Sequence, residues 1–233
     1  EIQRSLASRV SAEDGLEGPP RYVAGVDISP PDALGVAVAA AVLLELPELQ
    51  IVEVKVYQGK PDFPYVPGLL SFRESPLILG ALERLVTTPD LILVDGQGLA
   101  HPRRFGLACH LGLLVDAPTI GCAKSILTGR LSGNLAPRAG SRVPLVDRDN
   151  VVGAAVRTRD SVSPIYVSIG HKVSLDSAVA LTLACCKGYR IPEPTRLAHL
   201  AAAGRIAPRE PGEYQKPQHA SRDAAVHDKD GVK

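Results

Sequence analysis

The chain has 233 residues, of which 45% are hydrophobic and 22% are charged, and its formal net charge is +1. These values are typical of a soluble globular protein with one substantial core, and they predict a single α/β domain. A net charge this small excludes attraction of a polyanion by the protein as a whole, so any binding of nucleic acid must depend on a local basic patch.

The cysteines form no C-x-x-C pair and stand among apolar neighbours, at Cys109, Cys122, Cys185 and Cys186. This arrangement disfavours a zinc site and indicates buried thiols in a reducing compartment rather than a disulfide framework. The longest apolar run, residues 33–44, is too short to span a bilayer, and the N-terminus lacks the apolar segment of a signal peptide. We therefore expect a cytoplasmic protein.

The first third of the chain is expected to be rich in β-structure. Apolar residues at a spacing of four predict a short amphipathic helix over residues 1–10. Three β-rich runs with short, Pro-containing connections then predict an antiparallel meander, with strands over 22–29, 33–46 and 51–59. Residues 60–68 contain three prolines and are expected to form a loop.

The remainder alternates between helical and strand patterns. Helices are expected over 69–86, 103–115, 174–189 and 193–204, with Pro76 kinking the first of them or beginning a new helix. Short strands are expected over 89–96, 118–125, 151–158 and 164–170, with a loop over 129–142. Residues 1–207 form the predicted domain, and the polar residues 208–233 are expected to be a disordered tail.

This order of elements predicts an α/β fold. It describes one mixed sheet, a three-strand antiparallel meander plus parallel strands, with helices on both faces. The ribonuclease-H-like architecture fits this description, and so do several others.

Two aspartates have the same local context. Asp27 ends the apolar run YVAGV and Asp95 ends LILV, so each carboxylate follows a buried strand. If the two strands are neighbours, the carboxylates can converge on a divalent cation, and carboxylate oxygens are the ligands that Mg²⁺ prefers. The alternative for either aspartate alone is a turn or a helix cap.

Other candidates are weaker on spacing alone. His171 precedes a predicted helix that Ser174 would cap, and Asp176 would then lie in its first turn. These two residues either bind a metal ion or water, or Asp176 only complements the helix dipole. Glu74 stands beside Arg73, and a surface ion pair is as good an interpretation as a catalytic role. The other histidines, at 110, 199, 219 and 227, have no comparable context.

A group of basic residues follows the second aspartate. His101, Arg103 and Arg104 could pair with acids of the protein, or they could hold a phosphate group. Lys124 ends the apolar run TIGCA, and a lysine at the end of a buried strand needs an anion.

The segment PYVPG, residues 64–68, holds an aromatic ring between prolines. A rigid aromatic tip such as Tyr65 can wedge between stacked bases. The alternative is a loop that packs on its own domain.

Five segments of the chain resemble the blocks of the endonuclease V family, also known as deoxyinosine 3′-endonucleases. They cover roughly residues 20–200 in the family's order: VAGVDIS, PYVPGLLSFRESP, LILVDGQGLAHPRRFGLACHLG, TIGCAKS and GHKVSLDSAV continued by CCKGYRIPEPTRLAH. The resemblance implies a ribonuclease-H-like nuclease that depends on Mg²⁺, with Mn²⁺ as a substitute. Such enzymes recognise inosine, which is deaminated adenine, and cut the second phosphodiester bond on its 3′ side.

The resemblance also implies roles for individual residues. Asp27 and Asp95 match the metal-binding aspartates, and Glu74 matches the catalytic glutamate. His171 matches the region of the catalytic histidine, with Asp176 as a further acid. His101 and Lys124 match positions near the scissile phosphate, where Arg103 and Arg104 are further candidates. Tyr65 matches the wedge, and the implied base pocket comprises Pro67, Gly68, Leu70 and Gly96.

Two other functions are compatible with parts of the sequence. GVDIS followed by GVAVA could form the phosphate strand of an actin-like sugar kinase, but 233 residues are short for the second nucleotide domain of such a kinase. A binding module that has lost activity is the other alternative, and the presence of all the matched acids counts against it. We therefore expect a monomeric DNA-repair nuclease that binds inosine-containing DNA, and inosine-containing RNA as a further substrate.

Overall fold

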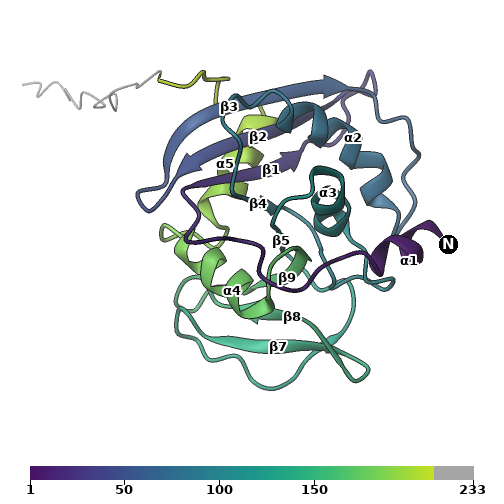
Figure 1. Ribbon diagram of the computed structural model, residues 1–233, viewed down its shortest axis with the longest axis vertical. Coiled ribbons are helices and arrows are strands. Elements are labelled where there is room, and N and C mark those ends of the chain that lie inside the picture. Colours follow the sequence, from purple (N-terminus) through teal and green to yellow (C-terminus); the bar gives the residue numbers. More distant parts are fainter. Residues whose placement is uncertain (213–233) are drawn as a thin grey trace, which may run out of the picture.

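The computed structural model describes residues 1–212, which form one sheet in the strand order β3-β2-β1-β4-β5-β9-β8-β7-β6 (Figure 1). The strands are β1 (Tyr22–Ile28), β2 (Ala37–Glu45), β3 (Gln50–Gly59), β4 (Leu91–Val94), β5 (Thr119–Ala123), β6 (Arg130–Leu131), β7 (Arg142–Asp147), β8 (Asn150–Val156) and β9 (Ile165–His171). The helices are α1 (Ile2–Ala7), α2 (Leu70–Leu82), α3 (Leu107–Val115), α4 (Leu175–Ala184) and α5 (Glu193–Ala202).

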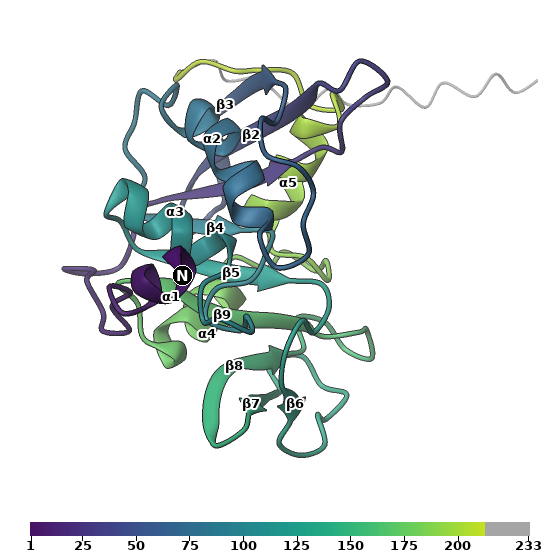
Figure 2. The same cartoon turned by 90° about the vertical axis from the view of Figure 1, so that its right-hand side faces the viewer.

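The pairing of the strands confirms the predicted fold class. Strands β1, β2 and β3 form the antiparallel meander, whereas β4 runs parallel to both β1 and β5. Strand β9 pairs antiparallel with β5 and leads into β8, β7 and β6, which lie at the end of the sheet farthest from β3 (Figure 2).

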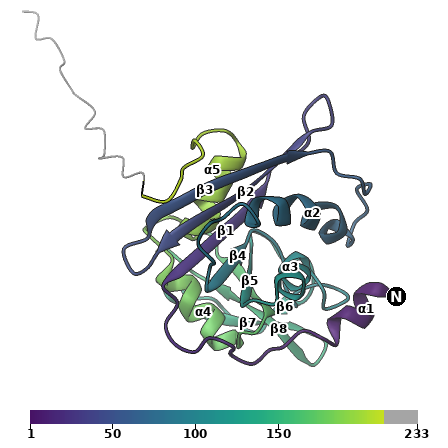
Figure 3. The ribbon, with the colours of Figure 1, turned by 45° about the horizontal axis from the view of Figure 1, so that its top comes forward.

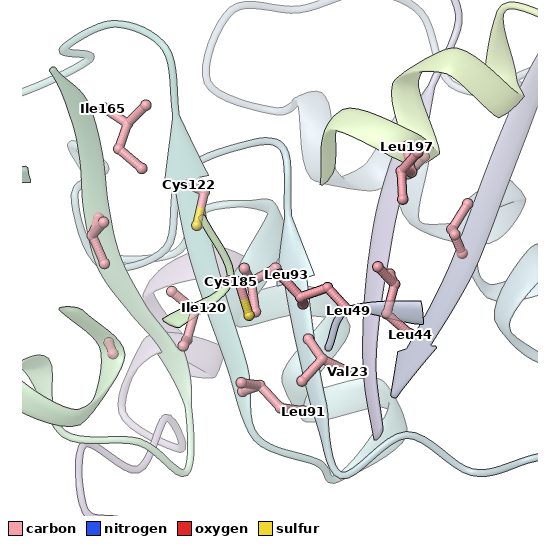
Figure 4. Close-up of a cluster of buried hydrophobic side chains, with 14 of the residues drawn as sticks. Val23, Leu44, Leu49, Leu91, Leu93, Ile120, Cys122, Ile165, Cys185 and Leu197 are labelled. Carbon is pink, nitrogen blue, oxygen red and sulfur yellow. The ribbon is translucent and has the colours of Figure 1, made fainter. Parts of the chain in front are cut away.

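Helices cover both faces of the sheet, as Figure 3 shows. One core cluster joins α4 and α5 to side chains such as Val23 of β1, and the other joins α2 and α3 to side chains such as Val26. Successive residues of a strand point to opposite faces, so β1 and β4 contribute to both clusters. Leu197 of α5 and Val23 of β1 both belong to the first cluster, part of which is drawn in Figure 4.

Two predicted elements differ from the observed ones. Pro76 lies inside α2 without ending it, because Leu77, Ile78 and Ala81 beyond it are buried in the core and hold the helix in place. Strand β7 was not predicted, because Pro144 interrupts its apolar pattern. The Pro144 carbonyl accepts a hydrogen bond from the N–H of Ser132, which lies just beyond the two-residue β6. The missing N–H of the proline therefore falls where the pairing of β7 with β6 has ended, while β7 stays paired with β8.

The ordered chain extends past the predicted domain boundary at residue 207. Val54 and Arg209 exchange two backbone hydrogen bonds of 3.1 and 2.9 Å, which attach Arg209 to β3. The rest of the predicted tail, residues 213–233, lies outside the described residues. Over residues 1–212, no helix has the length and apolarity needed to cross a bilayer.

Candidate active site

The two strand-end aspartates lie at the same edge of the sheet. Val26 of β1 is paired with Val94 of the parallel strand β4, and Asp27 and Asp95 are the residues that follow. The Asp95 N–H donates to the carbonyl of Val26 at 3.2 Å, which fixes the two backbones side by side. The predicted convergence of these carboxylates is therefore a property of the sheet register.

Asp27 is held between the sheet and helix α5. Its Oδ2 atom lies 2.8 Å from Nδ1 of His199, and its Oδ1 atom accepts the N–H of Ile28 at 2.8 Å. Only 12% of the Asp27 side chain is exposed. Burial raises the pKa of Asp27, the charge of Asp95 raises it further, and the hydrogen bond with His199 opposes both effects.

His199 is a site residue that the sequence analysis missed. It belongs to α5, which packs directly against β1 because β1 has a glycine at the crossing point. A Cβ atom at Gly25 would lie 2.0 Å from the carbonyl of Pro194, so no other residue fits there without displacing the helix. The glycine within an otherwise apolar strand was the available signal, since such a glycine marks close approach of another backbone.

Helix α2 brings the third carboxylate. Burial raises the pKa of Glu74 to about 7, and the neighbouring charges of Asp27 and Asp95 contribute, while Arg73 opposes them. The guanidinium of Arg73 donates to the carbonyl of Phe63 at 2.6 Å, so the predicted surface ion pair is not the main interaction of Arg73. Three carboxyl groups from β1, β4 and α2 thus repel one another at this edge.

Lys124 supplies positive charge to the same edge. It follows the last residue of β5, and its Nζ atom forms an ion pair with Oδ2 of Asp95. The anion that the sequence analysis required for Lys124 is therefore Asp95. We use the name carboxylate cluster for Asp27, Glu74 and Asp95, together with Lys124 and His199.

A cavity of about 350 Å³ adjoins the carboxylate cluster and is lined in part by Asp95 and Lys124. The loop before α2 forms one wall, and the turn between β4 and α3 forms another. The four residues of the implied base pocket line this cavity, and so do two further candidates for contact with nucleic acid: Pro67, Gly68, Leu70 and Gly96, with Tyr65 and His101. The other two candidates, Arg103 and Arg104, are not among its lining residues. Tyr65 is 69% exposed, so its ring projects from the cavity rim instead of packing into the domain.

The two arginines of the DGQGLAHPRR segment form pairs within the protein. Arg104 forms an ion pair with Asp147 at 2.5 Å, and Arg103 donates to the carbonyl of Gly68 at 2.9 Å. His101 is buried, and this burial lowers its pKa to about 4, with the charges of Arg103 and Arg104 adding to the effect. These contacts favour the structural-pairing alternative for both arginines and a neutral imidazole at His101.

The structure does not bring His171 or Asp176 to the carboxylate cluster. His171 is paired with Thr119, the first residue of β5, whereas Lys124 follows the last. At about 3.3 Å per residue, His171 lies roughly 15 Å from that end of the strand. Its Nδ1 atom accepts the N–H of Ser11 at 3.1 Å, and Asp176 forms an exposed ion pair with Arg142.

The carboxylate cluster offers donors suited to a divalent cation. Over residues 1–212, no three His, Cys, Asp or Glu side chains form a group that could hold a metal ion by themselves. Magnesium does not require such a cage, because it usually binds through one or two carboxylates, waters and substrate phosphates. Asp27 and Asp95 fit that requirement, and a cation between them would offset the repulsion that raises the pKa values of Asp27 and Glu74.

A mixed sheet of this order, with carboxylates at the ends of two central strands, defines a ribonuclease-H-like hydrolase. The sequence model of endonuclease V matches residues 4–200. A protein named endonuclease V from Gloeobacter violaceus is 54% identical over 201 residues, which cover 85% of this chain and 81% of the relative. The chain therefore belongs to the endonuclease V family, and it is a nuclease.

Solved structures support the same assignment. Endonuclease V from Streptomyces avermitilis has a TM-score of 0.82 at 47% identity, covering 87% of this chain and 89% of that one. The Ciona intestinalis endonuclease V, solved with a 23mer DNA containing an inosine followed by a ribo-adenosine, has a TM-score of 0.77 at 29% identity. That match covers 87% of this chain and 93% of the other. The predicted family and the ribonuclease-H-like fold are thereby confirmed, and the sugar-kinase alternative is excluded.

Proposed function

We propose that this nuclease recognises inosine in nucleic acid and hydrolyses the second phosphodiester bond on its 3′ side, leaving a 3′-hydroxyl and a 5′-phosphate. One observation carries the proposal: the cavity with the exposed Tyr65 at its rim shares Asp95 and Lys124 with the carboxylate cluster. A base-binding pocket and a phosphodiester-cleaving centre are thus adjacent. The Ciona relative solved with inosine-containing DNA supports the same substrate class.

Recognition would begin with extrusion of the damaged base from the helix. An inosine mispair unstacks more easily than a normal pair, which favours its selection. The ring of Tyr65 would fill the gap in the stack, while the walls at Gly68, Leu70 and Gly96 receive the base. The pocket must prefer the edge of hypoxanthine over that of guanine, which adds an exocyclic amine.

Asp27 and Asp95 would hold a Mg²⁺ ion, for which Mn²⁺ substitutes, with Glu74 beside it. When bound, the cation polarises the phosphate, favours ionisation of the attacking water and stabilises the leaving 3′-oxygen. The ammonium of Lys124 lies at the wall of the cavity, where it stabilises negative charge on the phosphate. His199 is 60% exposed and is bound to Asp27 through Nδ1. Its Nε2 atom has no hydrogen-bond partner within residues 1–212 and would exchange a proton with the reacting groups.

The proposed role of the enzyme is repair of DNA that contains deaminated adenine. We propose that it acts as a monomer in the cytoplasm, and that inosine in RNA is a further substrate. The described cysteines are all free thiols, which suits a reducing compartment.

The deciding experiment is a cleavage assay on end-labelled oligonucleotides with one inosine in single-stranded DNA, duplex DNA or RNA. We expect cleavage one nucleotide beyond the inosine with Mg²⁺, and none with EDTA or with guanine in its place. The Asp95→Asn variant should bind the inosine oligonucleotide without cutting it. Equal cleavage of the guanine control would contradict the proposal, and binding without cleavage by the unmodified protein would identify an inactive binding module.

A further inference from the structure

Gln3 is the buried residue of the short helix α1. It is 4% exposed, although its neighbours Ile2 and Arg4 face solvent. Its Nε2 atom donates to the carbonyl of Gly68 at 2.9 Å and to the carbonyl of Phe105 at 3.1 Å. Both N–H groups of the amide are therefore used, and both acceptors lie on walls of the cavity beside the carboxylate cluster.

The Gly68 carbonyl accepts hydrogen bonds from two side chains. Besides the Gln3 amide, the guanidinium of Arg103 donates to it at 2.9 Å. Arg103 also donates through Nε to the Oε1 atom of Gln3, so the amide and the guanidinium orient one another. The side chains of Gln3 and Arg103 thus form a clamp on one peptide group.

That peptide group belongs to a tight turn at the start of α2. The N–H of Leu69 donates to the carbonyl of Val66 at 2.9 Å, with Pro67 and Gly68 between them. Gly68 has φ +78, which with a preceding proline defines a type II turn. Leu69 is the residue that precedes α2, so fixing this turn also fixes the start of the helix that carries Glu74.

Phe105 anchors the opposite side of the clamp. It is fully buried in the turn between β4 and α3, the segment that also contributes Asp95 and Gly96 to the cavity. One side-chain amide therefore links two segments that are otherwise far apart in the sequence. The Gln3 side chain thus spans the two cavity walls, with one hydrogen bond to each.

We propose that Gln3 is a positioning residue for base recognition: its amide sets the distance between the Gly68 wall and the Phe105 wall of the pocket. The inference rests on the proposed function, since it assigns that pocket to hypoxanthine. Hypoxanthine and guanine differ by one exocyclic amine. A pocket that discriminates between these two bases therefore needs rigid walls. Loss of the amide widens or loosens the pocket, which weakens inosine binding and admits guanine.

The Gln3→Glu variant tests this inference. Glutamate has nearly the same shape and still accepts the hydrogen bond of Arg103, but it faces the carbonyls of Gly68 and Phe105 with an oxygen instead of an N–H group. We expect the Kd for an inosine oligonucleotide to rise roughly tenfold and cleavage of inosine relative to guanine to fall. The single-turnover rate at saturating inosine substrate should change much less. Ser5→Ala, at an exposed position of the same helix, is the matched control.

Gln3→Leu provides a second variant that removes all three hydrogen bonds. Both variants are compared per active site, below their unfolding midpoints. If both variants show only a lower concentration of active enzyme, with an unchanged Kd and an unchanged ratio of inosine cleavage to guanine cleavage, Gln3 merely anchors α1. The inference then fails. A wild-type protein that does not cut inosine DNA would instead refute the proposed function, so the two failures are distinguishable.

Discussion

Nδ1 of His199 and Oδ2 of Asp27 lie 2.8 Å apart, although 172 positions separate the two residues in the chain. The contact joins helix α5 to the end of strand β1. Because the hydrogen bond with Asp27 fixes the orientation of the imidazole ring, it also fixes the direction in which Nε2 points. A histidine fixed in this manner by a carboxylate is typical of a group that transfers protons.

Replacing His199 with alanine should therefore slow the chemical step. We expect a loss of about 10²–10⁴-fold in the single-turnover cleavage rate, the usual contribution of general acid–base catalysis. Binding should change little, because the side chain is largely exposed and its one side-chain hydrogen bond within residues 1–212 is with Asp27. Single-turnover kinetics with excess enzyme and a separate binding titration in Ca²⁺ would measure both quantities. A cleavage rate within threefold of wild type would show that His199 only holds Asp27.

His171 should behave in the opposite way. The buried imidazole accepts the N–H of Ser11, and its Nε2 atom lies 3.5 Å from Asp116. His171→Ala leaves that N–H without its partner, which costs about 1–3 kcal/mol of unfolding free energy. Chemical denaturation should show this loss, while the cleavage rate per folded molecule stays at the wild-type value. Loss of cleavage without loss of stability would return His171 to the list of catalytic candidates.

The contrast between these histidines shows what the sequence could reveal. Asp27 and Asp95 were predictable because each follows a short apolar strand, and parallel neighbours place such residues at one edge. His199 was not predictable from its own neighbours, since its position depends on how closely α5 approaches β1 across Gly25. The antiparallel meander and the parallel strands followed from local periodicity, whereas β7 was hidden by Pro144.

The arginines illustrate the same limit. Their sequence allowed either phosphate binding or pairing within the protein, and the partners that decide between these alternatives are Gln3 and Asp147. Neither partner is near the arginines in the sequence. Contacts of this kind depend on tertiary packing, which local composition does not encode.

Lys124 and Arg104 should consequently differ in their effect on binding. Lys124→Ala removes an ammonium at the cavity wall. The plot of the logarithm of the binding constant against the logarithm of salt concentration should therefore become less steep by about one unit of slope. Arg104→Ala removes a partner of Asp147 and should lower stability while leaving the slope unchanged. Titrations of labelled inosine DNA at several salt concentrations would measure the slopes. Equal reductions of the slope in both variants would show that Arg104 also contacts phosphates of the bound DNA.

Tyr65 is predicted to contribute to selection of the substrate and not to folding. Its exposed ring makes Tyr65→Ala nearly neutral in stability, within about 0.5 kcal/mol. Loss of a stacking ring should weaken binding to duplex inosine DNA by about 1–3 kcal/mol, and binding to single strands less, because no gap needs filling there. Tyr65→Phe keeps the ring and serves as the control. Equal effects on duplex and single strand would contradict the role of a wedge.

Glu74 should make the stability of the metal-free protein dependent on pH. Its pKa rises from 4.5 in the unfolded chain to about 7 in the native state. Between these pH values Glu74 binds more protons in the native protein than in the unfolded chain. Its contribution to the unfolding free energy is therefore fully present below pH 4.5 and is lost as pH rises towards 7. For this one group, the unfolding free energy falls by at most about 1.4 kcal/mol per pH unit.

Glu74→Gln removes that titration and should flatten the dependence. In EDTA at pH 8 the variant is expected to be more stable than wild type, because it lacks one of three mutually repelling carboxylates. Denaturation curves from pH 5 to pH 8 would measure the effect, with the exposed Glu83→Gln as a matched control on the residue after α2.

Added Mg²⁺ should stabilise wild type at pH 8 but not Asp27→Asn, since a ligand stabilises only the state that binds it. If the unfolding free energy of Glu74→Gln depends on pH as strongly as that of wild type, repulsion within the carboxylate cluster does not destabilise the native state.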